Sequence, residues 1–165
     1  MIGNDIVDLA LARKESNWKR NGFLDKIFTT KEQLLISNAE NAEVMVWNLW
    51  SRKEAAYKIY NRQKQIRGYF PLELECSDLE IIDGISFGKV VIKERIYFTK
   101  TEITTQCINT IAVENVLDFD IIKTLENRKN IQKNNGIPSY CEKENLISKP
   151  VSISHHGRFE QIISL

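Results

Sequence analysis

Apolar residues in the first third of the chain recur at strand spacing and then at helix spacing. Residues 2–7 have the character of a short buried strand that carries one acid, Asp5. Asp8 follows as a possible N-cap for a helix that runs through Trp18. The segment KIFTTKEQLLISNAE (26–40) then has a capping-box pattern, with Thr29 or Thr30 as N-cap and Glu32 or Gln33 three residues later.

A longer helix is predicted over residues 44–62. At 100° per residue its apolar arc contains Val46, Leu49, Trp50, Tyr57 and Tyr60. Lys53 falls near the middle of this arc and Glu54 at its edge, so the helix turns charged side chains toward its apolar side.

From Leu72 the period changes to that of strands. Four apolar runs, separated by turn signals such as DGISFG (83–88), predict an antiparallel meander: LELECSDLEII, KVVIKERIYF, EITTQ and CINTIAV. Residues 118–133 return to helical spacing, and the polar patch 129–136 predicts an exposed loop. NNGIPS marks a turn, and residues 150–165 close the chain as two β-rich runs around His156-Gly157. The pattern predicts an α+β fold with helices packed on an antiparallel sheet.

Length, composition and net charge limit the class of protein to which the chain can belong. The length of 165 residues suits one domain, 1–165, and 42% hydrophobic with 27% charged residues is ordinary for a soluble protein. A net charge of +1 supplies no global field for nucleic acid or anionic membrane. No signal peptide or apolar stretch of membrane-spanning length is present, and three scattered cysteines fit idle thiols in a reducing compartment. We therefore expect a soluble cytoplasmic protein without a nucleic-acid or membrane partner.

Lys53, Glu54 and Lys58 form the first candidate constellation. Glu54 and Lys58 lie one helical turn apart, which is also the spacing of an ordinary surface ion pair. Because Trp47, Trp50 and Tyr57 surround these charges, a site with perturbed pKa values is the alternative interpretation.

Asp5 is the second candidate, because an acid inside an apolar strand is costly to bury without a cation or donors. It could also accept backbone N–H bonds at a strand end. Asp8 fits an N-cap better. Asp5 and Glu54 together would make an oxygen site suited to Mg²⁺ that also holds substrate phosphates.

The two histidines, His155 and His156, stand together in SISHHG, where a strand would direct them to opposite sides. Ser152 and Ser154 give this strand a polar face that would end near His155. A basic run (Arg62, Lys64 and Arg67) follows the long helix and is either a solvated helix end or a surface for an acidic partner.

Three segments, GNDIVDL, WSRKEAAYK and PVSISHHGRF, resemble the motif set of the 4′-phosphopantetheinyl transferase superfamily. The family motifs are a G-x-D-[IV] strand, a W-x-x-K-E-[AS]-x-x-K helix and an S-x-S-H strand. The order of the motifs is similar to that of the short, holo-[acyl-carrier-protein] synthase type. The chain resembles a second half of the long type followed by the closing piece of a first half.

The resemblance implies a family-like fold and transfer of 4′-phosphopantetheine from coenzyme A to a serine of an acyl or peptidyl carrier protein, as in fatty acid biosynthesis. It implies that Asp5 and Glu54 bind Mg²⁺, with Asp8 as a further candidate that matches the acid of the short type. Glu54 is also a candidate base. It suggests the following coenzyme A ligands: Lys53, Lys58, Ser154 and His155.

Two departures keep an alternative open. Val7 occupies the position of a second acid in the long type, and Ile137 replaces the lysine of its NGKP motif. A non-catalytic coenzyme A-binding or interaction module on the same fold is therefore the second hypothesis. Because short relatives form their sites between subunits, we expect a homo-oligomer in which His155 of one chain faces Asp5 and Glu54 of the next.

Overall fold

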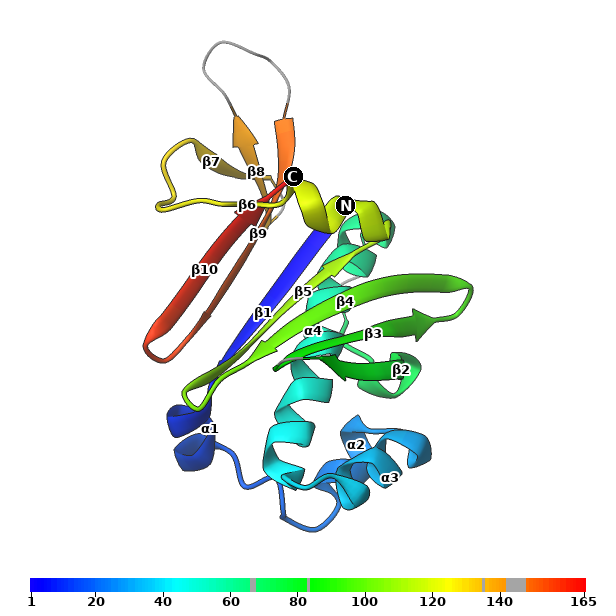
Figure 1. The fold of residues 1–165 in the computed structure, drawn as a ribbon. Coiled ribbons are helices and arrows are strands. Elements are labelled where there is room, and N and C mark those ends of the chain that lie inside the picture. Colours follow the sequence, from blue (N-terminus) through cyan, green and yellow to red (C-terminus); the bar gives the residue numbers. More distant parts are fainter. Residues whose placement is uncertain (66–67, 83, 135, 142–147) are drawn as a thin grey trace.

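The structure is a computed structural model that describes residues 1–65, 68–82, 84–134, 136–141 and 148–165 (Figure 1). Its helices are α1 (Leu9–Glu15), α2 (Phe23–Ile27), α3 (Thr30–Asn38) and α4 (Ala42–Lys64). Asp8 caps α1 and Thr29 caps α3 with Glu32 completing a capping box, as the sequence predicts. No helix in the described part of the chain combines the length and apolar character needed to cross a membrane.

The first sheet has the strand order β1-β5-β4-β3-β2 and is antiparallel throughout. Its members are β1 (Ile2–Asp8), β2 (Glu75–Ile82), β3 (Ile85–Ile92), β4 (Arg95–Ile103) and β5 (Cys107–Val113). The predicted meander is confirmed, with different boundaries. Lys93 and Glu94 turn the chain inside KVVIKERIYF, and EITTQ contains the end of β4 instead of a strand of its own.

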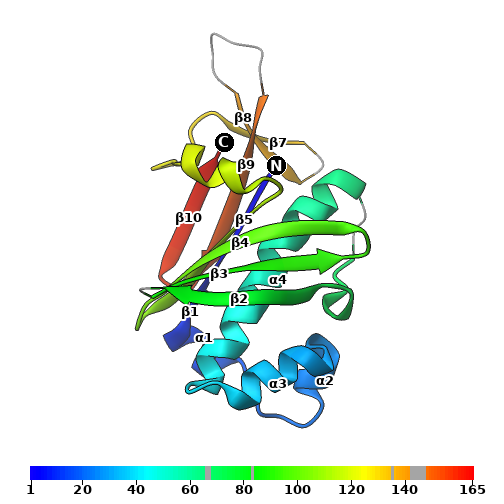
Figure 2. The same ribbon diagram turned by 45° about the vertical axis from the view of Figure 1, so that its right-hand side comes forward.

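Helix α4 packs against one face of this sheet (Figures 1 and 2). Its buried apolar residues join the strand side chains in the main core, together with α1, α2 and α3. Gly3 permits the close approach of β1 to the helix, because a Cβ atom there would lie 2.0 Å from the Ala55 carbonyl oxygen. The helix therefore presents its central residues directly to β1.

The second sheet has the order β6-β10-β9-β8-β7. Its members are β6 (Lys123–Thr124), β7 (Ile131–Asn134), β8 (Ile137–Cys141), β9 (Ser148–His156) and β10 (Phe159–Ser164). The terminal hairpin is as predicted.

The helix predicted over 118–133 is wrong. The described residues contain two 3₁₀ segments, η1 (Pro71–Glu73) and η2 (Val116–Ile121). Of these, η2 overlaps the start of the predicted helix, and the chain then continues into β6 and β7. Phe119 and Ile122 pack on a small cluster with Ile2, Val113 and Ile163, and this tertiary packing overrides the helical spacing. Most of 129–134 is exposed as expected, yet 131–134 is strand instead of loop, and Asn135 lies outside the described residues.

The two sheets meet along β1 and β9, as Figure 1 shows. Alternate amides of β1 face away from β5, and alternate side chains of β9 accept from them. Ser152 accepts from the Asn4 amide (2.9 Å), Ser154 from Ile6 (2.9 Å) and His156 from Asp8 (2.8 Å). The polar face of β9 thus satisfies a strand edge that would otherwise be buried without partners.

Candidate active site

Asp5 lies midway along β1, where the side chains of α4 and β9 meet. Its side chain is 15% exposed, and its Oδ1 atom accepts one hydrogen bond, from the Ser154 hydroxyl at 3.1 Å. Burial raises the pKa of Asp5 to about 6, against the opposing effects of Lys58 and Ser154. The groups around Asp5 therefore offset only part of the cost of burying its negative charge.

Glu54 is the second carboxylate of the site and is held by the middle of α4. Burial and the negative charge of Asp5 raise its pKa to about 7. The effect of Asp5 on Glu54 indicates that the two acids are electrostatic neighbours although they come from distant parts of the chain. Neighbouring carboxylates with raised pKa values are typical of a cation site.

The described residues contain no cluster of three or more histidine, cysteine or acidic side chains that could hold a metal. Two carboxylates nevertheless fit Mg²⁺, which keeps several water molecules and often takes further oxygens from substrate phosphates. The donor set of Asp5 and Glu54 is thus compatible with the ion that the family resemblance implies.

Lys58 lies beside this acid pair. Its Nζ atom is 3.7 Å from Asp5 Oδ1 and donates to the backbone carbonyls of Asn4 (2.6 Å) and Ile153 (3.3 Å). The ammonium therefore bridges β1 and β9 while its side chain stays 30% exposed. A partly exposed ammonium next to two acids can contact an incoming phosphate.

Tyr69 interacts electrostatically with Glu54, and the sequence patterns did not single it out. The Tyr69 ring makes edge contacts with Trp50 and Tyr57, at centroid distances of 5.6 and 5.1 Å. Burial, followed by the charge of Glu54, raises the pKa of Tyr69. Its hydroxyl is buried and does not meet hydrogen-bond geometry with any described residue. No spacing rule could have found it, because it follows the helix in an irregular segment.

His155 is exposed and lines two hollows, one beside Lys58 and one beside Asp5. His155 reaches Lys58 and Asp5 within one chain, because the β9–β10 hairpin packs against β1 of the same chain. The expectation that His155 of one chain faces Asp5 and Glu54 of the next stays a prediction, and within this chain His155 lies beside Lys58 and Asp5.

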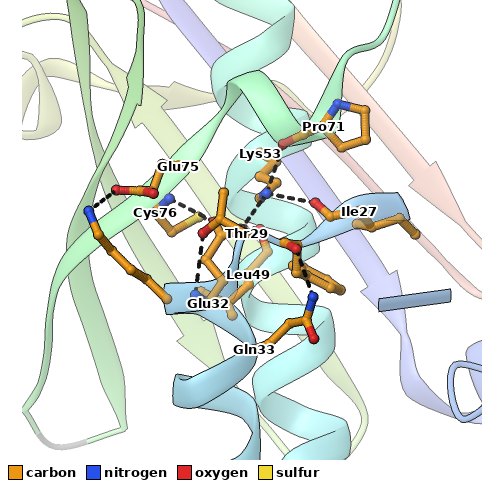
Figure 3. A network of polar contacts seen from close by, with 11 residues as sticks. Ile27, Thr29, Glu32, Gln33, Leu49, Lys53, Pro71, Glu75 and Cys76 are labelled. Atoms are coloured by element: carbon orange, nitrogen blue, oxygen red, sulfur yellow. Dashed lines mark hydrogen bonds and ion pairs between the residues drawn. The ribbon is translucent and has the colours of Figure 1, made fainter. Parts of the chain in front are cut away.

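Lys53 does not join the site. Its ammonium forms an ion pair with Glu32 (Figure 3). The distance from Lys53 Nζ to Glu32 Oε2 is 2.6 Å, and both side chains are fully buried. It also donates to the carbonyls of Ile27 and Pro71, each at 2.8 Å, and lies over the Phe28 ring. These contacts use its three N–H donors, which corrects the expectation that Lys53 contacts coenzyme A.

Asp8 also has its partners outside the Asp5–Glu54 pair. Its carboxylate caps α1 and accepts two side-chain hydrogen bonds from Arg158, at 2.9 and 3.0 Å. These donors hold the pKa of Asp8 well below its usual range. Gly157 makes the clamp possible, because it has a positive φ of 55° and a Cβ there would lie 2.5 Å from Asp8 Oδ2. Asp8 therefore joins β1 to the β9–β10 turn, and the structure does not offer its carboxylate to a cation at the Asp5–Glu54 pair.

Comparison with solved structures shows similarity to the crystal structure of Helicobacter pylori holo-[acyl-carrier-protein] synthase (AcpS) in complex with coenzyme A. The TM-score is 0.51 at 16% sequence identity, and the match covers 70% of this chain and 100% of that chain. At this identity the likeness establishes a common fold. A comparison with curated proteins gives no significant match. The model of the 4′-phosphopantetheinyl transferase superfamily (ACPS) matches residues 1–105, which contain both acids, Lys58 and all of α4. The chain therefore belongs to the 4′-phosphopantetheinyl transferase superfamily.

Proposed function

We propose that this protein transfers the 4′-phosphopantetheine group of coenzyme A to a serine of an acyl or peptidyl carrier protein, in a magnesium-dependent reaction. The observation that carries the proposal is the pair of neighbouring carboxylates, Asp5 and Glu54, with raised pKa values beside Lys58. Membership of the superfamily and the coenzyme A bound to the Helicobacter pylori relative support it.

In this reaction the serine oxygen forms a bond to the β-phosphorus of coenzyme A. The bond from that phosphorus to the bridging oxygen breaks, and adenosine 3′,5′-bisphosphate leaves. Mg²⁺ bound by Asp5 and Glu54 would supply positive charge for the pyrophosphate. Lys58 adds an ammonium on the β9 side of the acid pair, where negative charge accumulates on the leaving group.

Glu54 is the candidate base for the serine proton. One oxygen of its carboxylate can hold Mg²⁺ while the other accepts the proton. We assign His155 to the coenzyme A phosphates, because it is exposed and shares a hollow with Lys58. Ser154 has a different role in our proposal. It accepts from the Ile6 amide and donates to Asp5, so it orients that carboxylate instead of contacting coenzyme A.

A panel of apo carrier proteins incubated with this protein, coenzyme A and Mg²⁺ tests the proposal by intact-mass spectrometry. We expect a mass increase of one phosphopantetheine group on at least one carrier, and its loss when EDTA replaces Mg²⁺. The non-catalytic alternative predicts coenzyme A binding by calorimetry with every carrier mass unchanged. Binding without transfer across acyl and peptidyl carriers would therefore favour that alternative.

A further inference from the structure

The Tyr69 ring contacts two aromatic side chains of α4, and Glu54 lies between them in the sequence. Its centroid is 5.6 Å from that of Trp50 and 5.1 Å from that of Tyr57. Trp50 is four positions before Glu54 and Tyr57 is three positions after it, so the three side chains share one face of the helix. The two ring contacts therefore place Tyr69 along the face of α4 that carries Glu54.

The backbone on both sides of Tyr69 is tied to the same helix. The Gly68 amide donates to the Tyr57 hydroxyl at 3.3 Å. Two residues after Tyr69, the Pro71 carbonyl accepts from Lys53 Nζ at 2.8 Å. These bonds and the two ring contacts hold the side chain without any help from its hydroxyl. We therefore expect the ring to keep its place when the hydroxyl is removed.

The Tyr69 hydroxyl is buried and meets hydrogen-bond geometry with none of the described residues. Burial raises the pKa of Glu54, and the Tyr69 hydroxyl opposes part of this rise. The pKa of Tyr69 is itself raised by burial and then by the charge of Glu54. A buried donor without a partner costs free energy, and an ionised carboxylate is a stronger acceptor than a neutral group. The hydroxyl is therefore a donor that remains available to the Glu54 carboxylate.

We propose that Tyr69 is a positioning residue, which donates its O–H to the Glu54 carboxylate and orients it toward a bound cation. This inference rests on the proposed function, which assigns Mg²⁺ to Asp5 and Glu54. Asp5 has a corresponding donor in the Ser154 hydroxyl, at 3.1 Å. Neighbouring hydrogen-bond partners commonly fix the orientation of carboxylates that bind metals. Because each carboxylate oxygen accepts two bonds, a bond from Tyr69 leaves room for the cation.

Mn²⁺ binding, measured by electron paramagnetic resonance without coenzyme A, tests the inference, because Mn²⁺ takes the same oxygen ligands as Mg²⁺. Tyr69→Phe keeps the ring and should raise the Kd for Mn²⁺ by about tenfold or more. Its urea midpoint in EDTA should equal or exceed that of wild type, since the lost hydroxyl has no partner. In the mass assay, half-maximal transfer should need about tenfold more Mg²⁺, with an unchanged KM for coenzyme A at saturating Mg²⁺.

Tyr97→Phe is the matched control. Tyr97 is also buried, but its hydroxyl donates to Gln63 Oε1 at 2.8 Å, so its loss should lower the urea midpoint and leave Mn²⁺ affinity unchanged.

Three results would overturn the inference. One is a wild-type affinity for Mn²⁺ no stronger than that of Glu54→Gln, and another is an unchanged affinity in Tyr69→Phe. The third is a loss of affinity in Tyr69→Phe that comes with a lower urea midpoint, because Tyr69 would then act on the fold. Failure of the proposed function appears separately, as absence of phosphopantetheine transfer by wild type while the Mn²⁺ affinities of wild type and Tyr69→Phe still differ.

Discussion

Two of the lysines of helix α4, Lys53 and Lys58, each lie beside an acid, but the two acids differ in how fully their charge is compensated. Lys53 and Glu32 are both fully buried, and every donor of Lys53 has a partner. The Glu32 carboxylate also accepts from the Thr29 and Cys76 amides, each at 2.8 Å. This ion pair is complete without any ligand.

The second lysine, Lys58, lies 3.7 Å from Asp5 in a partly exposed setting, with Glu54 nearby. Two acids share one ammonium here, and burial keeps the pKa of each acid raised. The comparison teaches that burial alone does not distinguish a structural charge from a functional one. What distinguishes them is whether the charged group has a full set of partners within the protein. A charge that lacks such partners retains affinity for a ligand.

The largest effect is expected from Glu54→Gln. If Glu54 holds Mg²⁺ and accepts the serine proton, this isosteric change should lower phosphopantetheine transfer by at least about 10³-fold while the protein stays folded. Transfer is measured by intact mass, and folding by circular dichroism. Glu43→Gln is the control, because Glu43 lies on the same helix and its ion-pair partner among the described residues is the exposed Arg13. Turnover within tenfold of wild type would refute the assignment of Glu54.

Lys53→Met should act on stability instead of on activity. Removing the ammonium leaves Glu32 buried without countercharge, which costs about 3–5 kcal/mol of unfolding free energy. Urea unfolding measures the loss, and transfer per folded molecule should stay near that of wild type. The double variant Glu32→Gln, Lys53→Met should recover part of the stability, since the unpaired charge is gone. A selective loss of coenzyme A affinity in folded Lys53→Met would instead return Lys53 to the active site.

Lys58→Met is expected to behave in the opposite way. Loss of a positioned ammonium beside the pyrophosphate should lower transfer by about 10²-fold, with a smaller stability change than in Lys53→Met. Parallel urea titrations and mass assays on the two methionine variants measure both quantities. Equal stability losses in the two variants would remove the distinction between the lysines.

The sequence predicts the elements whose periodicity is local, such as α4, the β2–β5 meander and the hairpin around Gly157. The helix that the sequence predicts over 118–133 is wrong, because side chains of this segment pack on a cluster that includes residues from both ends of the chain. At the site, Asp5 and Glu54 were predicted as acids in apolar settings. The partner of Lys53 was missed because Glu32 fits a capping box, which is usually exposed, and nothing in its spacing indicates complete burial.

The smallest expected effect is a pH dependence of stability without Mg²⁺. The pKa of Glu54 rises from its ordinary value of 4.5 to about 7 on folding. Below pH 4.5 both states are protonated and Glu54 contributes no difference. Between pH 4.5 and 7 the unfolded state loses its proton first, so the free energy of unfolding falls as pH rises. The loss levels off above pH 7 at about 2 kcal/mol, after allowance for partial exposure of the side chain.

Glu54→Gln lacks this titration and isolates the effect. In EDTA we expect it to be more stable than wild type by about 2 kcal/mol at pH 8 and equally stable at pH 4. Addition of Mg²⁺ at pH 8 should stabilise wild type more than the variant, because a cation bound to the folded state favours the ionised carboxylate. Urea titrations at the two pH values measure the difference. A variant less stable than wild type at pH 8 would mean that the Glu54 carboxylate is already compensated within the protein, as the Glu32 carboxylate is by Lys53.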